Sequence, residues 1–450
     1  MASLQEKDKK FLWHPYTQMQ DYAGRDLLII DRAAGISLFD ETGRRYYDTI
    51  SSWWCIVHGH SHPLITERIR AQLSRLDQVL LAGVGHEGAI LLAEKLVELA
   101  GPGLDRVFFS DNGSTACEVA IKMSLQYWRQ SGRAERCGLV ALERGYHGDT
   151  IGTMSLGGVP EFHSVFAPLL FPSHRLPSPY CYRCPAGENP ANCDCQCLAP
   201  LVELLAVQGE RIAAVIVEPL IQAAGGMIVY PAACLKKLAA LTRAAGVHLI
   251  LDEVATGFGR TGTMFAMEQA GVRPDFLCLS KGLTAGMLPM AATLASEEIF
   301  LAFYGEYDLG RTFFHGHTFT GNPIAAAAAL GSLEVFAQER TMAGLPEKIA
   351  RLQQRMRRCA ELPWVGDLRQ LGMISALELV KDRARKTPYA FEERVGWPIY
   401  LAGLEQGLLL RPMGNVIYLW LPLSTSLEEI DEITERVWQV LSDSRNIRGW

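Results

Sequence analysis

The 450-residue sequence lacks long hydrophobic runs and lacks an excess of charge of one sign. No apolar stretch reaches the roughly 18 residues that a membrane span requires, and the first ten residues lack the apolar core of a secretory signal. The 43 basic residues nearly balance the 49 acidic ones, and the net charge of −6 favours neither nucleic acid nor an anionic membrane as a partner. We therefore expect a cytoplasmic protein that binds neither.

The sequence also lacks the cysteine pattern of a disulfide-stabilised protein. Its eleven cysteines are an odd number, and six of them are scattered, which is typical of reduced thiols. The other five gather in a segment at about 178–198 that is rich in Pro, Asn and Gly. Their C-x-x-C and C-x-C spacings can hold zinc or an iron–sulfur cluster, although the short spacers are not a standard signature. The candidate metal ligands are Cys181, Cys184, Cys193, Cys195 and Cys197. Disulfides or free thiols are the alternative, and in either case we expect a structural staple away from the chemistry.

The sequence does contain the alternating pattern of an α/β protein. A chain of this length is too long for one ordinary core, and it shows no internal repeat. Between about 61 and 330, apolar runs alternate with helical patterns, which predicts βαβ units and a mostly parallel sheet. The candidate strands are 106–109, 138–142, 212–217, 247–251 and 276–279.

The two ends of the chain differ from this central pattern. Residues up to about 60 are predicted to form short strands, with a hairpin turn at 41–43. From about 335 the pattern predicts a helix, a hairpin at 366–380, another helix, two strands and a last helix at 426–441.

Two of the predicted strands end on a charged residue, Asp252 in one case and Lys281 in the other. Ligands bind at the carboxyl ends of the strands in a parallel sheet. A lysine there can form a Schiff base with pyridoxal phosphate, and a carboxylate can keep the pyridine nitrogen protonated. A free lysine has a pKa of about 10.4, so the site must favour its neutral form. Taken alone, either residue could equally be an ordinary surface charge.

Three segments resemble the class III pyridoxal-phosphate aminotransferases. They are D-E-V-A-T-G-F-G-R-T-G (252–262), L-S-K-G-L-T-A-G (279–286) and H-G-H-T-F-T-G-N-P (315–323), and the similarity extends from about Trp13 to the last helix. The resemblance implies pyridoxal 5′-phosphate as cofactor and small-molecule substrates.

The same resemblance implies the PLP-dependent transferase type I fold, which is an α/β architecture. A large domain with a mostly parallel sheet would span 61–330 and bind the cofactor. A small α+β domain would combine an N-terminal segment, 1–60, with the C-terminal part, 331–450.

The resemblance assigns several residues to the cofactor ring. Lys281 bonds to the cofactor and carries the proton, and Asp252 binds the ring nitrogen. Tyr146, which follows the strand at 138–142, matches the aromatic residue that stacks on the ring, with core packing as the alternative. Glu218 matches a residue near the cofactor, with helix capping as the alternative.

The phosphate end of the cofactor is expected at the start of a helix. Gly113 and Ser114 match the family's phosphate-binding residues, where free amides and the helix dipole hold the anion. Thr115 and Glu118 could form a capping box at this point. Thr318 matches a residue that reaches the phosphate bound by the other subunit, which implies a homodimer with two composite sites.

Three further segments resemble one branch of the class: W-H-P-Y-T-Q-M (13–19), S-S-W-W (51–54) and G-Y-H-G-D-T (145–150). Members of this branch transfer an amino group from S-adenosylmethionine to 8-amino-7-oxononanoate and form 7,8-diaminononanoate in biotin biosynthesis. Ping-pong kinetics are expected for the two half-reactions.

Substrate contacts follow from the same resemblance. Arg411 matches the residue that binds the acceptor's carboxylate, a task that suits a bidentate guanidinium. Further residues match a second arginine near the substrate, an aromatic wall and an acid near the amino donor. For the aromatic residues, plain packing is the alternative. The complete set is Tyr16, Trp53, Trp54, Asp149, Arg260, Arg411 and Tyr418.

Three alternatives to this function remain open from the sequence. The same acceptor could receive its amino group from lysine, because few contacts separate the two donors. The second alternative is another ω-amino acid aminotransferase. The three segments typical of the branch argue against it. A non-catalytic metal-binding scaffold is the third, and the intact Lys281 and Asp252 argue against it.

Overall fold

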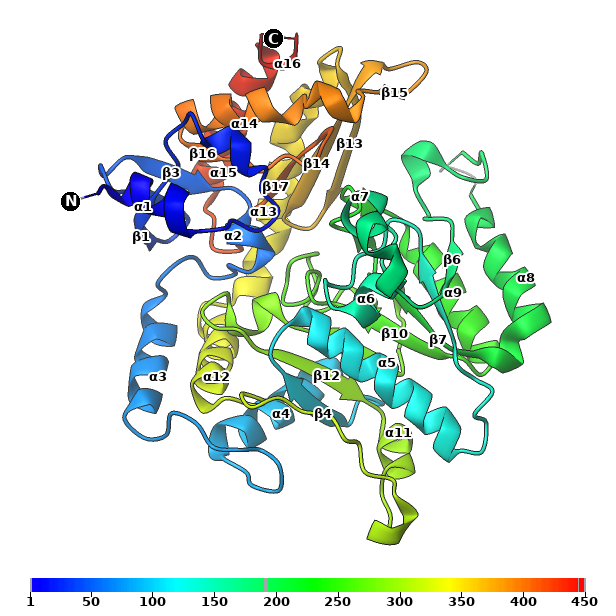
Figure 1. The fold of residues 1–450 in the computed structure, drawn as a ribbon. Coiled ribbons are helices and arrows are strands. Elements are labelled where there is room, and N and C mark those ends of the chain that lie inside the picture. The colour runs from blue at the N-terminus through cyan, green and yellow to red at the C-terminus, as the bar shows by residue number, and fades with distance from the viewer. Residues whose placement is uncertain (1, 190–192, 444, 449–450) are drawn as a thin grey trace.

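The computed structural model describes residues 2–189, 193–443 and 445–448. Within these ranges, no helix is both long enough and apolar enough to cross a membrane. The chain folds into a large α/β part with a smaller part built on it, and the first and last segments of the chain both lie in the smaller part (Figure 1).

A seven-stranded sheet forms the centre of the large part. Five neighbouring strands are parallel, whereas β12 runs antiparallel to both of its neighbours. All five strands predicted from the sequence are present, within one residue at each end. The order across the sheet is β4 (Arg106–Ser110), β12 (Ala291–Ala295), β11 (Phe276–Leu279), β10 (His248–Asp252), β7 (Ile212–Val217), β5 (Gly138–Leu142) and β6 (His174–Leu176).

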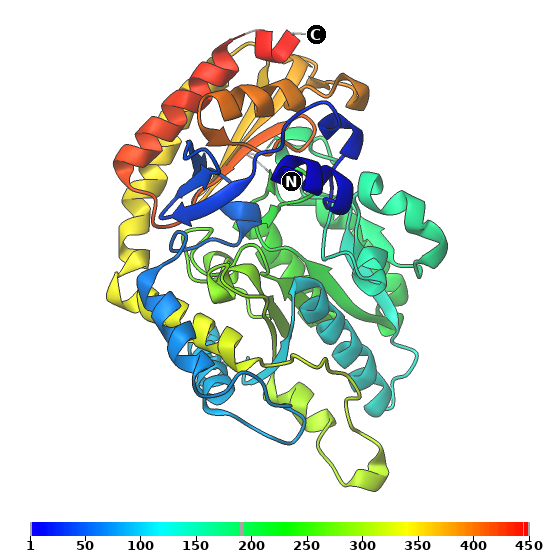
Figure 2. The same cartoon turned by 60° about the vertical axis from the view of Figure 1, so that its left-hand side comes forward.

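Apolar side chains cover both faces of this sheet. Along β10, Leu249 and Leu251 belong to one buried cluster and Ile250 belongs to another, so the strand is buried on both faces. Such continuous apolar runs are typical of parallel strands between two helical layers. Helix α5 packs on one face, and helices α4, α8, α9 and α12 contribute to the cluster on the other (Figure 2). Their bounds are α4 (Glu87–Ala100), α5 (Gly113–Gln130), α8 (Ala199–Gln208), α9 (Ala232–Ala244) and α12 (Pro323–Gln338).

Helix α5 begins earlier than the predicted capping box implied. Asn112 is the N-cap, and its side chain accepts a hydrogen bond from the amide of Thr115 at 3.1 Å. Glu118 lies one turn farther on and accepts a hydrogen bond from the Thr150 hydroxyl at 2.6 Å. The expectation of a Thr115–Glu118 capping box is therefore wrong, because an asparagine is a better N-cap than an interior threonine.

The smaller part joins segments from both ends of the chain. Strand β16 pairs in parallel with β3, so a C-terminal strand completes an N-terminal sheet. This sheet has the order β1 (Ile30–Ala34), β2 (Ser37–Asp40), β3 (Arg45–Asp48) and β16 (Leu408–Leu409). A second sheet holds β13 (Val365–Leu371), β14 (Ile374–Asp382), β15 (Thr387–Pro388) and β17 (Val416–Trp420). Three helices accompany these sheets: α13 (Thr341–Met356), α14 (Gly396–Glu405) and α15 (Leu427–Ser442).

Short elements complete the described chain and mostly connect the larger ones. They are α1 (Leu4–Phe11), α2 (Ser51–Trp54), α3 (Pro63–Leu73), α6 (Ile151–Leu156), α7 (Pro160–His163), β8 (Ile221–Gln222), β9 (Ile228–Val229), α10 (Met267–Ala270), α11 (Glu297–Ala302) and α16 (Arg445–Arg448).

The cysteine-rich segment lies between β6 and α8 and shows one departure from the sequence analysis. Cys195 forms a disulfide with Cys234 of α9, with their Cα atoms 5.5 Å apart. The expectation of a reduced thiol is therefore wrong for Cys234, and Cys195 is no longer a candidate metal ligand. The sequence could not indicate this pairing, because 39 residues separate the two cysteines and only the packing of the segment against α9 brings them together.

Candidate active site

A cavity of about 680 Å³ lies where the carboxyl ends of β4, β5, β7, β10 and β11 meet. Each of these strands delivers at least one polar residue to the cavity wall, either from its own last residue or from the loop that follows. The predicted residues that line it are Trp54, Gly113, Ser114, Tyr146, Asp149, Glu218, Asp252 and Lys281. The fold therefore brings together side chains that the sequence separates by more than 200 positions.

Lys281 follows β11 directly and is the amine of the cavity. Burial lowers its pKa, although the nearby carboxylate of Asp252 opposes this effect. A larger fraction of the amine is therefore neutral than in water, as a proton carrier requires. The Lys281 Nζ lies 5.5 Å from the centre of the Trp54 ring, which forms one wall of the cavity.

Asp252 is held in place by two hydrogen bonds. The Nδ1 of His147 lies 2.7 Å from one carboxylate oxygen, and the amide of Val254 donates to the other at 3.1 Å. Both the Asp252 and the His147 side chains are buried. No role was predicted for His147, although it belongs to the G-Y-H-G-D-T segment (145–150).

The first turn of α5 forms the anion-binding end of the cavity. The amides of Gly113 and Ser114 are among those that have no intrahelical partner. A Cβ on Gly113 would lie 2.4 Å from Val254 Cγ1, and one on Gly148 would lie 2.2 Å from Ser114 Oγ. Glycine is therefore required at both positions, because a Cβ would clash with Val254 or Ser114 and push the first turn of α5 out of place.

Glu218 and Tyr146 form the opposite wall. The carboxylate of Glu218 accepts hydrogen bonds from the amides of Tyr146 at 3.0 Å and Ala223 at 2.9 Å, so it fixes the loop after β5. Burial raises the pKa of Glu218 to about 7. Burial also raises the pKa of Tyr146 well above its ordinary value, so the phenol is protonated and acts as a donor.

Asp149 lies between two tyrosines at the mouth of the cavity. It accepts a hydrogen bond from the hydroxyl of Tyr146 at 2.9 Å and another from the hydroxyl of Tyr16 at 2.7 Å. Burial, followed by the hydrogen bond to Asp149, raises the pKa of Tyr16 to about 12. Both phenols therefore stay protonated at neutral pH and hold the carboxylate in one position.

Arg411 approaches the same mouth from the smaller part of the protein. Its guanidinium lies 4.3 Å from the centre of the Trp53 ring, and the edge of the Tyr16 ring packs against Trp53 with centroids 5.6 Å apart. Stacking on an indole holds a guanidinium flat and leaves its edge free for a carboxylate.

Six of the predicted residues do not line the cavity itself. Tyr16, Trp53 and Arg411 lie at its mouth, as described above, and the other three lie elsewhere. Arg260 is buried and donates to the carbonyl oxygens of Ile56, at 2.9 Å, and Leu421, so it links the two parts of the protein. Burial lowers the pKa of Arg260 to about 9. Tyr418 is buried behind Trp54, whose indole donates to its hydroxyl at 3.2 Å. Thr318 is exposed on a loop outside the cavity of its own chain.

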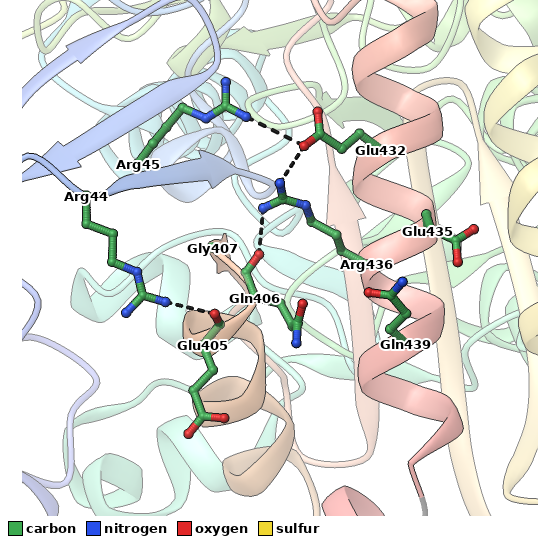
Figure 3. A pocket seen from close by; sticks show the side chains of 9 residues that line it. All are labelled: Arg44, Arg45, Glu405, Gln406, Gly407, Glu432, Glu435, Arg436 and Gln439. Carbon is green, nitrogen blue, oxygen red and sulfur yellow. Dashed lines mark hydrogen bonds and ion pairs between the residues drawn. The ribbon is translucent and has the colours of Figure 1, made fainter.

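A second hollow lies on the smaller part, between β3, α14 and α15 (Figure 3). Most of its charged side chains already have partners within the protein. Glu432 contacts both Arg45 and Arg436, and Arg44 donates to the carbonyl oxygen of Glu405 at 2.8 Å. It contains neither the lysine nor the aromatic residues of the first cavity, so the chemistry belongs to the first cavity.

Comparisons with known proteins agree with this geometry. The family model for aminotransferase class III matches residues 19–441. The adenosylmethionine-8-amino-7-oxononanoate aminotransferase of Geobacter sulfurreducens is 46% identical over 434 residues, which cover 96% of both chains. The solved structure of the protein with that name from Methanocaldococcus jannaschii is 40% identical, covers 98% of both chains and has a TM-score of 0.92.

A further solved structure bears on the cofactor. It is the ω-transaminase from Pseudomonas jessenii in complex with PMP, which is 32% identical, covers 99% of this chain and 98% of its own, and has a TM-score of 0.93. These likenesses extend over almost the whole length of both chains and include the type I transferase fold. The chain therefore belongs to the class III aminotransferases.

Proposed function

We propose that this protein transfers an amino group from S-adenosylmethionine to 8-amino-7-oxononanoate, forming 7,8-diaminononanoate in biotin biosynthesis, with pyridoxal phosphate as cofactor. The observation that carries the proposal is the pairing of two recognition groups at one cavity mouth: Asp149 between two tyrosine hydroxyls, and Arg411 on the face of Trp53. The relatives from Geobacter sulfurreducens and Methanocaldococcus jannaschii carry the same two substrates in their names.

The residues of the cavity fit the cofactor. The amides of Gly113 and Ser114 would hold its phosphate, beside the space that a Cβ would fill. Lys281 would bind its aldehyde, and Asp252 would hold the charge on its ring nitrogen. When bound, the cofactor supplies an aldehyde that reacts with amines and a ring that accepts electron density.

The protein's own groups position the reactants and move the proton. Burial lowers the pKa of Lys281. Its amine is therefore available in the neutral form, which can accept a proton and pass it on. His147 keeps the Asp252 carboxylate in a fixed orientation at 2.7 Å. Tyr146 covers the cavity, and Glu218 holds its loop in place through the Tyr146 amide.

Donor and acceptor each have a matching group at the mouth. A donor that carries a sulfonium is a cation, and Asp149 with two aromatic faces, those of Tyr16 and Tyr146, suits a cation. The acceptor is an anion with a terminal carboxylate, and the free edge of the Arg411 guanidinium suits a bidentate contact. Trp53 and Trp54 line the apolar path between them.

The donor assignment is tested by mixing the purified pyridoxal form with S-adenosylmethionine or with lysine. We expect S-adenosylmethionine to convert the absorbance to that of the pyridoxamine form, and lysine to leave it unchanged. Lys281→Ala is the control, because this variant keeps the fold and binds the cofactor non-covalently but cannot carry the proton. A rapid conversion by lysine with none by S-adenosylmethionine would show that lysine is the donor, and conversion by an unrelated ω-amino acid alone would contradict the branch assignment.

The homodimer is part of this proposal. Thr318 lies on an exposed loop, and the nearby side chains of Phe314 and Phe319 are 87% and 62% exposed. Large apolar side chains in such a position favour a subunit interface. We propose that this loop completes the phosphate site of the partner subunit. The domain boundaries at 60 and 330, the cytoplasmic location, the lack of nucleic-acid or membrane binding and the roles of Arg260 and Tyr418 toward substrate stay predictions.

Subunit mixing tests the composite site. Thr318→Ala and Lys281→Ala each weaken or abolish activity alone. If Thr318 serves the partner's site, a mixed dimer has one intact site, and mixing the two variants restores activity above that of either. If Thr318 serves its own subunit, no mixed dimer has an intact site and mixing restores nothing.

A further inference from the structure

Four side chains form a closed ring at the mouth of the cavity. Phe162, in the short helix α7, packs against the ring of Tyr16 with centroids 5.2 Å apart and against the ring of Tyr146 with centroids 6.2 Å apart. Both pairs meet edge to face, at interplanar angles of 82° and 87°, which is an arrangement that aromatic rings prefer. The hydroxyls of the same two tyrosines donate to Asp149, one to each carboxylate oxygen. Phe162 therefore holds the rings of the two tyrosines whose hydroxyls Asp149 holds.

The backbone sets the position of Phe162 relative to Tyr146. The amide of Arg144 donates to the carbonyl oxygen of Gly158 at 2.9 Å, and the amide of Gly158 donates to the carbonyl oxygen of Gly145 at 2.7 Å. The chain that leads into α7 therefore runs alongside the loop that carries Tyr146. A Cβ on Gly158 would lie 2.5 Å from the Arg144 nitrogen, so this approach requires glycine. One local unit thus presents both Phe162 and Tyr146 to the mouth of the cavity.

Tyr16 depends on Phe162 more than Tyr146 does. Tyr16 lies in a turn outside the helices and strands, and its side chain is 46% exposed. Its ring is held by side-chain contacts with Phe162, Asp149 and Trp53. Tyr146, by contrast, is also fixed through its backbone amide, which donates to a buried carboxylate at 3.0 Å. Loss of the Phe162 ring would therefore release mainly Tyr16 and loosen its hold on Asp149.

The chemistry of this ring of side chains distinguishes two classes of amino donor. A sulfonium carries its charge on a carbon-bound sulfur and has no N–H or O–H, so it gains from aromatic faces and needs no hydrogen-bond acceptor. Lysine keeps a primary ammonium whichever of its two amino groups reacts, and that group has three donors and is strongly hydrated. Both oxygens of Asp149 already accept a hydrogen bond from a phenol. The ring therefore suits a sulfonium better than it suits an ammonium.

We propose that Phe162 is a positioning residue that sets the specificity for the amino donor. It acts through Tyr16 and Tyr146, which it holds in the arrangement that accepts a sulfonium and disfavours a primary ammonium. Phe162 does not line the cavity that holds Lys281, so it affects recognition of the donor's charged centre rather than the chemical step. This role of Phe162 rests on S-adenosylmethionine as the proposed donor and adds the residue that selects it.

The donor half-reaction of Phe162→Leu tests this role. The pyridoxal form of the holoenzyme is mixed with increasing S-adenosylmethionine, and its conversion to the pyridoxamine form is followed by absorbance. We expect the half-saturating concentration to rise about tenfold, because two ring contacts are lost, whereas the limiting rate should change by less than about threefold. Phe162→Tyr keeps the ring, and its half-saturating concentration should stay within about threefold of the wild-type value.

Two controls separate donor recognition from damage to the fold. Phe166→Leu is the matched substitution, because Phe166 follows α7 closely, is 44% exposed and is not one of the rings that pack on Tyr16 or Tyr146. It should leave the half-saturating concentration unchanged. In the acceptor half-reaction, the pyridoxamine form is mixed with the keto acid. Its rate should be unchanged in every variant, because the acceptor's proposed anchor, Arg411, stacks on Trp53 and not on Phe162.

Lysine, added as a competitor of S-adenosylmethionine, measures the specificity itself. The ratio of the inhibition constant of lysine to the half-saturating concentration of S-adenosylmethionine should fall about tenfold in Phe162→Leu, because only the sulfonium loses its aromatic faces. Phe162→Ile also removes the ring and gives the same test should the leucine variant not fold.

The outcomes separate this role from the proposed function. An unchanged half-saturating concentration in Phe162→Leu, a parallel rise of both constants, or an equal loss in the donor and acceptor half-reactions overturns the role of Phe162. Each of these results leaves the proposed function standing, because the wild type still reacts with S-adenosylmethionine. A wild type that reacts with lysine and not with S-adenosylmethionine overturns the proposed donor, and the role of Phe162 with it.

Discussion

The backbone of residues 51–54 is left-handed at four consecutive non-glycine positions, with φ of 50°, 48°, 90° and 73°. Such a conformation costs on the order of 1 kcal/mol or more per residue. The Ser51 hydroxyl compensates in part by donating to the carbonyl oxygen of Trp420 at 2.6 Å. The unusual turn places Trp53 under Arg411 and Trp54 beside Lys281, so the strained backbone positions aromatic rings against two functional groups of the site.

Arg411→Ala tests the acceptor anchor. We expect the KM for the keto acid to rise about tenfold to a hundredfold, because losing a hydrogen-bonded charge pair costs roughly 1.5–3 kcal/mol. The KM for the donor should change much less. Steady-state kinetics with each substrate varied in turn measure both constants. Arg411→Lys keeps the charge but lacks the planar, bidentate guanidinium. Its KM for the keto acid should lie between those of the wild type and Arg411→Ala. An equal rise for both substrates would show that Arg411 is not the carboxylate anchor.

Glu253 provides a test of pH dependence outside the cavity wall. It is fully buried, and burial raises its pKa to about 7, although the amides of Ala266 and Met267 donate to it. Because the pKa of Glu253 in the folded state exceeds its ordinary value of 4.5, the folded state binds more protons than the unfolded state between pH 4.5 and 7. Its contribution to stability is therefore full below about pH 4.5 and is lost as the pH rises through 7.

The measurement compares the wild type with Glu253→Gln, whose side chain does not titrate. As the pH rises from 4.5 to 7, the wild type should lose on the order of 1–3 kcal/mol of unfolding free energy relative to the variant. Denaturant unfolding at several pH values measures it. A difference that is flat over this window would show that Glu253 titrates normally.

At the scale of elements, the start of helix α5 shows how one position can control a ligand site. The helix must approach the loop after β10 closely enough to present its free amides to the cavity, and the contact of Gly113 with Val254 sets that distance. Strand β12, by contrast, consists mainly of alanine and still pairs with both β11 and β4. Its place in the sheet depends on its neighbours, since alanine has little preference for strands.

Gly113→Ala tests this element. The new Cβ would lie 2.4 Å from Val254 Cγ1, so the first turn of α5 must shift. We expect the folded protein to retain pyridoxal phosphate at least tenfold less tightly, measured by cofactor loss on dialysis. Gly209→Ala is the matched control, because Gly209 has a helical φ of −51° and nothing within 4 Å of a new Cβ. Equal cofactor retention by the two variants would contradict the role of the first turn.

At the scale of the whole molecule, a buried ionic network joins the large part to the smaller one. Glu378 accepts from Arg183 at 2.7 and 2.9 Å and lies 2.9 Å from Arg369, whose guanidinium also donates to the carbonyl oxygens of Gly226 and Met227 at 2.6 Å. Arg369 holds the pKa of Glu378 below its ordinary value in spite of burial, which raises it. The relative position of the two parts, and hence of Arg411 over the cavity, depends on such contacts.

Glu378→Gln should destabilise the protein by roughly 1.5–3 kcal/mol, because it removes the charge that faces the buried Arg369 and the half-buried Arg183 and leaves Arg369 with Asp367 as its remaining carboxylate. Thermal unfolding should show a clearly lower midpoint. Asp443→Asn is the control, since the pair of Asp443 with Arg445 is at the surface and its loss should leave the midpoint unchanged. Equal midpoints for wild type and Glu378→Gln would show that the network contributes no stability.

The sequence by itself determined five of the seven strands of the central sheet and the residues that follow them. The runs before Asp252 and Lys281 are continuous and apolar, and such local patterns predict strands without knowledge of their neighbours. The motifs around them also indicated the family, and the fold implied by that resemblance is confirmed. Strands β12 and β6 were not predicted, because the alanines of β12 carry no strand signal of their own and β6 has only three residues.

Only the tertiary structure decided how distant side chains meet. Tyr16 and Asp149 are 133 residues apart and share a hydrogen bond, whereas Arg260, although it stands in a cofactor-site motif, turns inward to backbone carbonyls. The pairing of Cys195 with Cys234 likewise arises where a loop packs on a helix. Local patterns state which face of an element is buried, but the direction and partner of each side chain depend on long-range packing, which no segment of the sequence contains.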